Sequence, residues 1–348
     1  MRCVLSYFKS YFNPSSKAPL QNHSAGQIAQ HLYRTLNASC DVHYFGGEEK
    51  PSGLEADLFI GHFWSFAEMC ERNSFDIKVA FYSVSDPEAT RQLMETLARR
   101  YDVPVPYWDL PPAGFDHERT MELADLVFLV GNTYTLQSFP RRWHSKIRLL
   151  NYSIDTELYS QNRSTAACDE FCYVATHNGL RKGFMDILQT WSTIDEGTSK
   201  LHAIGHLDHP WDRLLERHNT GSIIHHGWID SDAPEYRQII KDCKFAHIPT
   251  CSEGQMGTLL EVIFSGCIPI TTRASGIDDH LLEHCLVVDP LNVAQQRSAI
   301  HQALSWSDQE YAIRRKRLMD AAHHYHSWTA FEDRVSTEIR ALQAPQTA

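Results

Sequence analysis

The stretch Phe245–Thr271 decides the fold class; it reads FAHIPTCSEGQMGTLLEVIFSGCIPIT. Two short apolar runs flank a polar loop and a longer apolar run with helical spacing. The expected order is a strand at Phe245–Ile248, a loop with Gly254 and Gly257, a helix at Thr258–Ser265 that ends at Gly266 in a left-handed cap, and a strand at Ile268–Thr271. Two strands joined through a helix lie parallel in one sheet, so this stretch predicts an α/β fold.

The same alternation of strands and helices runs through the rest of the chain. Further strands are expected at Cys3–Tyr7, Asp57–Gly61, Val79–Val84, Leu126–Val130, Ile147–Leu150, Phe171–Ala175, Leu201–Ile204, Ile223–His226 and Leu286–Val288. Helical patterns are expected at Ser24–Leu36, Met121–Asp125, Thr133–Phe139, Gly183–Trp191, Ala233–Asp242 and about Asp308–Leu342, the last with a break near His326–Trp328. The small and polar segment Gln161–Asp169 is the expected linker between two domains.

Composition is that of a globular protein. The chain has 348 residues, of which 43% are hydrophobic and 22% charged. Its net charge of −11 disfavours binding to nucleic acid, which needs a basic surface. The nine scattered cysteines favour free thiols in a reducing compartment. The sequence shows no signal peptide and no run long enough to span a membrane, which predicts a cytoplasmic protein, peripheral to the membrane at most.

The loop between Ile248 and Thr258 is the most informative candidate for a ligand site. It follows a strand and precedes a helix, whose N-terminal N–H groups favour phosphate. Glu253 lies in the loop. Glu261 is expected on the first turn of the helix, close to the same end of the sheet. Thr258 and Glu261 also have the spacing of a capping box, which would satisfy backbone donors without any ligand. The segment alone leaves both interpretations open.

Taken with other motifs, this segment resembles the signature of retaining glycosyltransferases of the GT-B fold, in particular family 4. Glu253 and Glu261 stand as that family's E-x7-E pair, and Gly266, Pro269 and Ile270 as the following Gly-x-Pro turn. Weaker similarities run from about residue 2 to 342: they are Ala25-Gly26, His62, Ala124-Asp125, Tyr152–Asp155, Arg181–Gly183, His226–Trp228 and Trp328.

The resemblance implies two tandem Rossmann-like, doubly wound domains with an interdomain cleft. The expected divisions are an acceptor domain at 1–160, a nucleotide-sugar donor domain at 170–325, and a C-terminal helix at 326–348 that returns to the first domain. The implied activity is transfer of a sugar from a nucleoside-diphosphate sugar to a glycan, lipid-linked or small-molecule acceptor, with retention of anomeric configuration. A degenerate, non-catalytic module that binds a sugar or a partner is the alternative.

The resemblance also implies roles for individual residues. Lys182 is expected to contact the donor diphosphate, Glu253 the sugar or its developing charge, and His62 the sugar from the first domain. Glu261 is expected to accept hydrogen bonds from the ribose. The remaining donor-binding candidates are Arg181, His177, Gly254, Gln255, Met256, Gly257, Thr258, Gly227 and Trp228, and Gly26 stands in the acceptor-side loop.

Three features of the sequence are not explained by the family motifs. His177 stands where the family usually has an arginine, so Arg181 or His177 would supply the second diphosphate contact. The histidines around 202–209 and 225–226 invite a metal site, but their spacing is not the i, i+4 spacing of a helical pair, and neither a metal nor a cofactor is expected. The basic run 314–317 is either a solvated helix face or a contact for anionic lipid.

Overall fold

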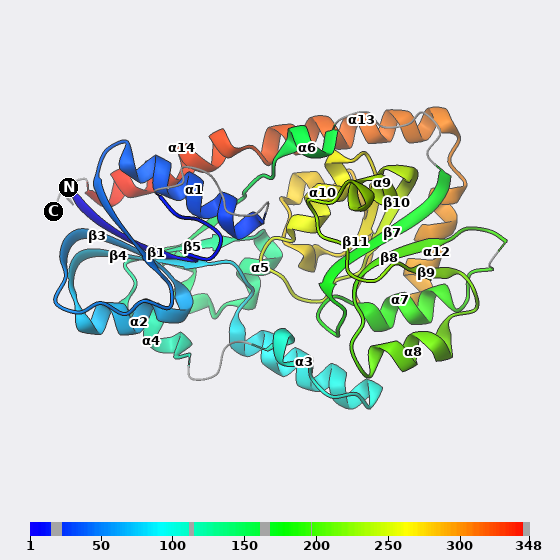
Figure 1. Ribbon diagram of the computed structural model, residues 1–348, viewed down its shortest axis with the longest axis horizontal. Helices are drawn as coiled ribbons and strands as arrows, with labels where there is room; N and C mark the ends of the chain where they lie inside the picture. Colours follow the sequence, from blue (N-terminus) through cyan, green and yellow to red (C-terminus); the bar gives the residue numbers. More distant parts are fainter. Residues whose placement is uncertain (15–22, 111–114, 161–167, 196, 344–348) are drawn as a thin grey trace. The chain divides into compact units, whose positions relative to one another are not determined.

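The chain forms two compact units. The computed structural model describes residues 1–14, 23–110, 115–160, 168–195 and 197–343 (Figure 1). The first unit comprises Met1–Ser85, Pro112–Ile154 and His326–Ala348, and the second comprises Asp86–Pro111 and Asp155–Tyr325. The chain thus passes between the units more than once.

A parallel six-stranded sheet forms the centre of the first unit. Its strand order is β2-β1-β3-β4-β5-β6, and every neighbouring pair is parallel. The strands are β1 (Arg2–Tyr7), β2 (Asp41–Gly46), β3 (Glu55–His62), β4 (Ser74–Tyr82), β5 (Leu126–Val130) and β6 (Ile147–Leu150). All five residues of β5 are buried, as expected for a parallel strand covered on both faces.

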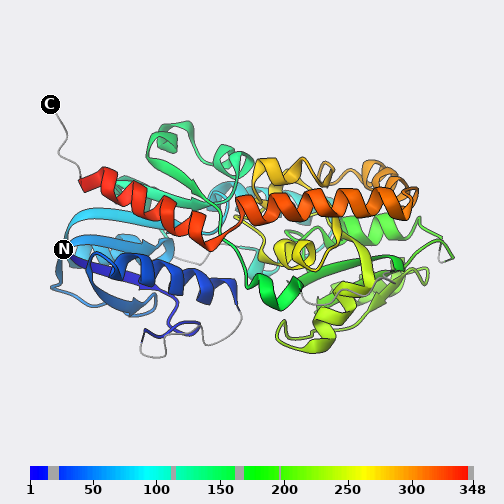
Figure 2. The same ribbon diagram turned by 90° about the horizontal axis from the view of Figure 1, so that it is seen from above.

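Helices cover this sheet, and one of them comes from the end of the chain. They are α1 (Ser24–Asn37), α2 (Phe63–Arg72), α4 (His117–Leu123), α5 (Thr133–Ser138), the 3₁₀ turn η2 (Arg141–Lys146) and α14 (Trp328–Gln343). Helix α14 packs on α1 and β6, and Figure 2 shows it beside α1. The contact includes the stacked rings of His31 and Trp328, whose centroids are 3.9 Å apart.

The second unit is built around a second parallel sheet of six strands. Its order is β12-β11-β10-β7-β8-β9. The strands are β7 (Cys168–His177), β8 (Leu201–His206), β9 (Ile223–His225), β10 (Cys243–Ile248), β11 (Ile268–Thr271) and β12 (Leu286–Val287).

The helices of the second unit include a contribution from the first half of the sequence. They are α3 (Pro87–Tyr101), η1 (Tyr107–Asp109), α6 (Thr156–Ser160), α7 (Phe184–Trp191), α8 (Trp211–His218), α9 (Pro234–Asp242), α10 (Gly257–Phe264), η3 (Arg273–Ser275), α11 (Asp279–Leu282), α12 (Val293–Leu304) and α13 (Asp308–Tyr325). Helix α3 begins at Pro87, and the Asp86 carboxylate caps it by accepting a hydrogen bond from the N–H of Ala89 at 2.8 Å.

The two parallel, helix-flanked sheets confirm the expected α/β, doubly wound architecture. Most expected elements differ from the observed ones only at their ends, although the strand expected at Val79–Val84 is β4, which begins earlier, at Ser74. The expected linker falls at residues 161–167, which lie outside the described residues, and at Cys168 and Asp169, which belong to β7.

The structure groups Asp86–Pro111 with the second unit, whereas the sequence places this segment within a domain of residues 1–160. Polar contacts join the segment to loops of the second unit. Thr90 Oγ1 and Ser252 Oγ are 2.9 Å apart, and Asp109 forms an ion pair with Arg181. The segment 326–348 groups with the first unit.

Among the described helices, none combines the length and the apolar character that crossing a bilayer requires.

Candidate donor site in the second unit

Strand order identifies one place in the second sheet where a ligand crevice forms. From β7 the chain proceeds outward to β8 and β9, and it then returns to the other side of β7 to form β10. At such a switch point the loops that follow the two neighbouring strands diverge, and ligands bind beyond the carboxyl ends of the strands. The loops after β7 and β10 carry Arg181, Lys182 and Glu253.

The two loops are locked together by backbone contacts. Gly183 has φ +70°, and a Cβ at this position would lie 2.1 Å from the carbonyl oxygen of Pro249, so only glycine fits. The Arg181 carbonyl accepts hydrogen bonds from Cys251 N at 2.8 Å and Thr250 Oγ1 at 2.9 Å. These contacts hold the Arg181–Lys182 pair against the loop that contains Glu253.

Glu253 lies between two cationic side chains. Lys182 Nζ is 2.6 Å from its Oε1, and Arg181 Nη1 is 2.7 Å from its Oε2. Thr250 Oγ1 also donates to Oε1, at 3.2 Å. Burial alone would raise the pKa of Glu253, but the charges of Arg181 and Lys182 bring it below its usual value. Burial lowers the pKa of Lys182, and the charge of Glu253 opposes that effect.

A second carboxylate, Asp109, supports Arg181. Asp109 is 2% exposed. Its Oδ1 lies 3.4 Å from Arg181 Nε, and its Oδ2 accepts the Arg181 backbone N–H at 3.2 Å. Burial raises the pKa of Asp109, and the Arg181 charge opposes this. The site thus contains two cations and two carboxylates close together.

The loop Gly254–Thr258 is buried at its first three residues and partly exposed at Gly257 and Thr258. Gln255 and Met256 are 6% and 2% exposed. The loop rests on the turn after β11, since Met256 N donates to the Ser275 carbonyl at 2.9 Å and a Cβ on Gly276 would lie 1.3 Å from the Gly254 carbonyl oxygen.

The N-terminus of α10 is not capped by a side chain. Its N-cap residue is Met256, which provides no side-chain hydrogen bond, so the capping box between Thr258 and Glu261 is not formed. Within the described part of the chain, the buried Thr258 Oγ1 has no hydrogen-bond partner. The helix begins at Gly257, one residue earlier than expected, so Glu261 is its fifth residue and lies just past the first turn. Of the first-turn N–H groups, that of Leu259 donates to the Met256 carbonyl at 3.2 Å. The positive end of the helix dipole at this N-terminus favours an anion.

Glu261 is held by two tyrosines. The hydroxyl of Tyr236, on α9, donates a short hydrogen bond to Glu261 Oε2, and the hydroxyl of Tyr159, on α6, bonds the same carboxyl group. Both tyrosines are buried. Burial raises the pKa of Glu261 to about 7, although the two hydroxyl donors oppose the shift.

His177 does not join the charged cluster described above. Its ring stacks between Trp108, at 4.9 Å, and His206, at 5.0 Å, and its Nδ1 is 3.7 Å from Asp208 Oδ2. Trp228 also stacks on His206, at 5.0 Å, and is 44% exposed. Gly227, before it, has φ +76° and open space around its Cα. Arg181, rather than His177, therefore occupies the position of second cation beside Glu253.

The two candidates in the first unit lie near the ends of elements. His62 ends β3, next to the switch point between β1 and β3 in that sheet. It is 2% exposed among Tyr7, Phe8 and Trp64, and burial lowers its pKa to about 3, so the ring is neutral. Gly26 lies in the first turn of α1. The roles that the resemblance implies for both residues stay predictions.

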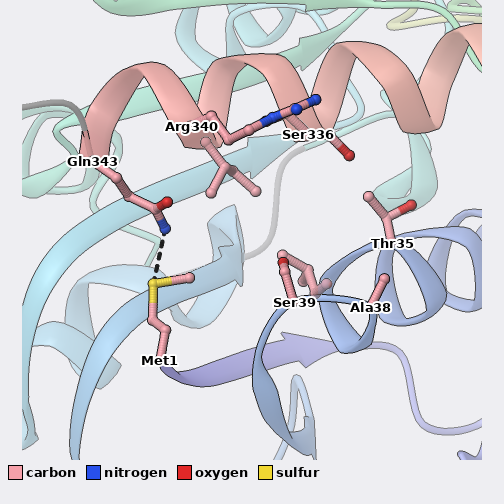
Figure 3. Close-up of a pocket in the computed structure, with 9 residues that line it drawn as sticks. Met1, Thr35, Ala38, Ser39, Ser336, Arg340 and Gln343 are labelled. Carbon is pink, nitrogen blue, oxygen red and sulfur yellow. Dashed lines mark hydrogen bonds between the residues drawn. The ribbon is translucent and has the colours of Figure 1, made fainter.

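A separate pocket lies in the first unit, and it contains none of the expected site residues. It has a volume of about 410 Å³ and opens between α1 and α14 (Figure 3). Its lining includes Met1, Ser39 and Arg340. Among the described residues no group of three or more His, Cys, Asp or Glu side chains could hold a metal ion. His202 instead bonds His226 at 2.9 Å and Glu170 at 2.9 Å.

The sequence reasoning missed three polar residues of the site. Asp109 lies in a proline-rich segment about 70 residues before Arg181, and Tyr159 and Tyr236 are far from Glu261 in sequence. None of the three belongs to a motif. Only the fold brings them to the switch point.

Comparison with known proteins agrees with this architecture. Residues 169–305 match the family model of the glycosyl transferases group 1. No curated protein matches the sequence. Sucrose-phosphate synthase from Thermosynechococcus elongatus is similar in structure, with a TM-score of 0.66 at 14% identity over 99% of this chain and 100% of that one.

Two further solved structures have comparable similarity. One is a trehalose-6-phosphate synthase studied for glycosyl transfer with retention, with a TM-score of 0.64 at 10% identity over 98% of this chain and 99% of that one. The other is Anabaena HepE in complex with UDP and glucose, with a TM-score of 0.63 at 10% identity over 98% and 100%. At such identities the likeness establishes the fold, and the family match covers residues 169–305, which lie in the second unit. The chain thus has the GT-B fold of these glycosyltransferases, and its second unit contains a segment that matches the group 1 glycosyl transferase family.

Proposed function

We propose that the chain transfers a sugar, with retention of anomeric configuration, from a nucleoside-diphosphate sugar held at the switch point between β7 and β10. The observation that carries this proposal is the cluster of Arg181, Lys182 and Glu253 beside the uncapped N-terminus of α10. Two cations and a helix N-terminus are suited to bind a diphosphate and to stabilise it as a leaving group. The acceptor is a hydroxyl-bearing glycan, lipid-linked sugar or small molecule.

The chemistry follows from the charges in the cluster. In the ligand-free site Lys182 pairs with Glu253. An arriving diphosphate replaces Glu253 as the partner of Lys182. The freed carboxylate oxygen of Glu253 then accepts a hydrogen bond from a sugar hydroxyl. As the bond from the anomeric carbon to the diphosphate breaks, Lys182 and Arg181 balance the negative charge that builds on the leaving group. This arrangement neutralises the leaving group without requiring a metal ion.

Two neighbouring structures support the choice of nucleotide for the first experiment and the stereochemical outcome. HepE was solved with UDP and glucose, and the trehalose-6-phosphate synthase is described as a retaining enzyme. UDP and UDP-glucose are therefore the first ligands to test, followed by the GDP and ADP series. The anomeric configuration of any product, read by NMR, tests retention.

Lys182→Ala tests the phosphate site. We expect UDP to raise the melting temperature of the wild type, since a ligand at about 100 times its Kd adds about 2.7 kcal/mol to the free energy of unfolding. Loss of one hydrogen bond between charged groups should weaken UDP binding and turnover by roughly 10- to 150-fold in the variant. The panel is run with and without Mg²⁺.

Lys316→Ala is the matched control, because Lys316 is exposed on α13 and forms an ion pair with Asp320 of the same helix. A folded Lys182→Ala protein that binds UDP within twofold of the wild type contradicts the assignment of Lys182. Nucleotide binding without transfer to any acceptor favours the non-catalytic module. No response to any nucleotide contradicts the proposed donor site itself.

A further inference from the structure

The segment Asp86–Pro111 reaches the candidate donor site with two consecutive side chains. Trp108 stacks on His177, at the end of β7. Asp109 contacts Arg181, in the loop that follows. A hydrogen bond between Thr90 and Ser252 joins the same segment to the loop after β10. A segment that ends about 44 residues before the rest of the second unit begins, at Asp155, is therefore built into the site.

Asp109 holds Arg181 at two points. One carboxylate oxygen accepts the Arg181 backbone N–H at 3.2 Å, and the other faces its Nε at 3.4 Å. The guanidinium then presents Nη1 to Glu253 at 2.7 Å. An arginine fixed at both its backbone and its side chain loses little conformational freedom when it binds a phosphate oxygen.

The loop is shaped around this carboxylate. A Cβ on Gly179 would lie 2.5 Å from Asp109 Oδ2, so a larger residue there would displace the carboxylate. The Asp109 side chain is fully buried, whereas Arg181 is 22% exposed. Asp109 therefore lies behind Arg181, away from solvent, where it supports the arginine.

We infer that Asp109 is a positioning residue of the donor site, which fixes the Arg181 guanidinium for contact with the donor diphosphate. This inference rests on the proposed function. Asp109 acts through Arg181, and the strap formed by Asp86–Pro111 completes the donor site of the second unit.

Asp109→Asn separates positioning from simple charge balance. The amide keeps the size of the carboxylate and one acceptor oxygen but removes a negative charge. If Asp109 only balanced charge, its removal would strengthen the attraction of the site for a diphosphate. If Asp109 positions Arg181, UDP affinity falls by about tenfold, because a misplaced charged group loses its hydrogen bond to the phosphate.

The experiment measures UDP binding by calorimetry and KM and kcat for UDP-glucose, on wild type, Asp109→Asn and Thr90→Ala. Thr90→Ala is the matched control, since it breaks the Thr90–Ser252 bond of the same strap without touching Asp109. We expect UDP affinity to fall in Asp109→Asn and to stay within twofold of the wild type in Thr90→Ala. Unchanged or tighter UDP binding in Asp109→Asn overturns the inference.

A crystal structure of Asp109→Asn provides a readout that needs no ligand. The pair between Arg181 Nη1 and Glu253 Oε2 should be lost or displaced, and its persistence at 2.7 Å overturns the inference. If the wild type binds no nucleotide, the proposed function fails, yet the crystal structure still decides the role of Asp109. Should Asp109→Asn not fold, Gly179→Ala tests the same contact by pushing the carboxylate from its place, with the same outcomes.

Discussion

Glu253, in the loop after β10, is shared by two cations from the loop after β7, and this sharing shapes the behaviour of the site. A buried carboxylate without partners would be costly, and so would two buried cations. Here each group offsets the desolvation of the others, since Arg181 and Lys182 both contact Glu253 within 2.7 Å. The ligand-free site is thus stable while its cations remain partly exposed, at 22% and 16%.

Glu261 should make binding of a ribonucleotide depend on pH. Its pKa of about 7 in the folded protein lies above its ordinary value of 4.5. The stability that its protonated form contributes is therefore complete below about pH 4.5 and is lost as the pH rises through 7. The ionised carboxylate is the better acceptor for ribose hydroxyls, so UDP affinity should rise between pH 6 and pH 8.

The comparison that isolates Glu261 is UDP affinity against pH in the wild type and in Glu261→Gln. The terminal phosphate of UDP also ionises near pH 6, as phosphate monoesters do, and this contribution is common to both proteins. The difference between the two profiles should therefore follow one group that titrates near pH 7. Parallel profiles would show that the ionisation of Glu261 has no part in binding the nucleotide.

Among the elements, the turn from β7 into α7 is tightly constrained by a neighbouring backbone. Gly183 is the N-cap of α7 in the left-handed region, and it abuts the Pro249 carbonyl. Gly183→Ala should cost roughly 1–3 kcal/mol of stability for backbone strain, with the steric contact adding to it. It should also weaken UDP binding, because Lys182 precedes the turn. Urea denaturation and calorimetry measure the two effects.

Gly53→Ala is the control for that prediction, since Gly53 also has a positive φ, +75°, but has nothing within 4 Å of its would-be Cβ and lies in the first unit. It should cost stability for strain alone and leave UDP affinity unchanged. Equal loss of UDP affinity in both variants would contradict a specific role for the turn at Gly183.

The elements themselves could be predicted from sequence where the apolar pattern is strong. The strands at Leu126–Val130, Ile147–Leu150 and Ile268–Thr271 have the expected bounds, because buried parallel strands are continuous apolar runs between polar loops. Helix α3 and strand β2 were not anticipated. The burial pattern of β2, at the edge of its sheet, alternates exposed with partly buried residues, and its apolar signal is correspondingly weak.

Only half of the candidate site could be predicted in the same way. Glu253, Lys182 and Arg181 lie in loops that follow strands, so the α/β order itself points to them. Asp109 and the tyrosines that hold Glu261 could not be found, because their contacts join distant parts of the chain. The capping box at Thr258 and Glu261 was a local alternative that tertiary contacts override, as Glu261 bonds Tyr236 instead.

At the scale of the whole molecule, helix α14 groups with the first unit, although it follows the second unit in sequence. Helix α14 buries Phe331, Val335 and Ile339 within the first unit, and Glu332 bonds His31 of α1 at 2.6 Å. Helix α13, which directly precedes it, groups with the second unit. Stability of the first unit therefore depends on a helix that follows the whole of the second unit in sequence.

Phe331→Ala should for this reason destabilise one unit selectively. Phe331 is 1% exposed, and replacing a buried phenylalanine by alanine costs about 3–5 kcal/mol. Two units need not unfold as one, so a single melting temperature does not locate the loss. Hydrogen exchange read by mass spectrometry does: peptides from β1, β3 and α1 should lose protection, while those from β7 and β10 keep it. Asp333→Ala, at an exposed position of the same helix, should leave all of them unchanged. Equal loss of protection in β7 and β10 would instead mean that the two units unfold as one cooperative body. The division of the chain into two units would then not correspond to two separate free energies of unfolding.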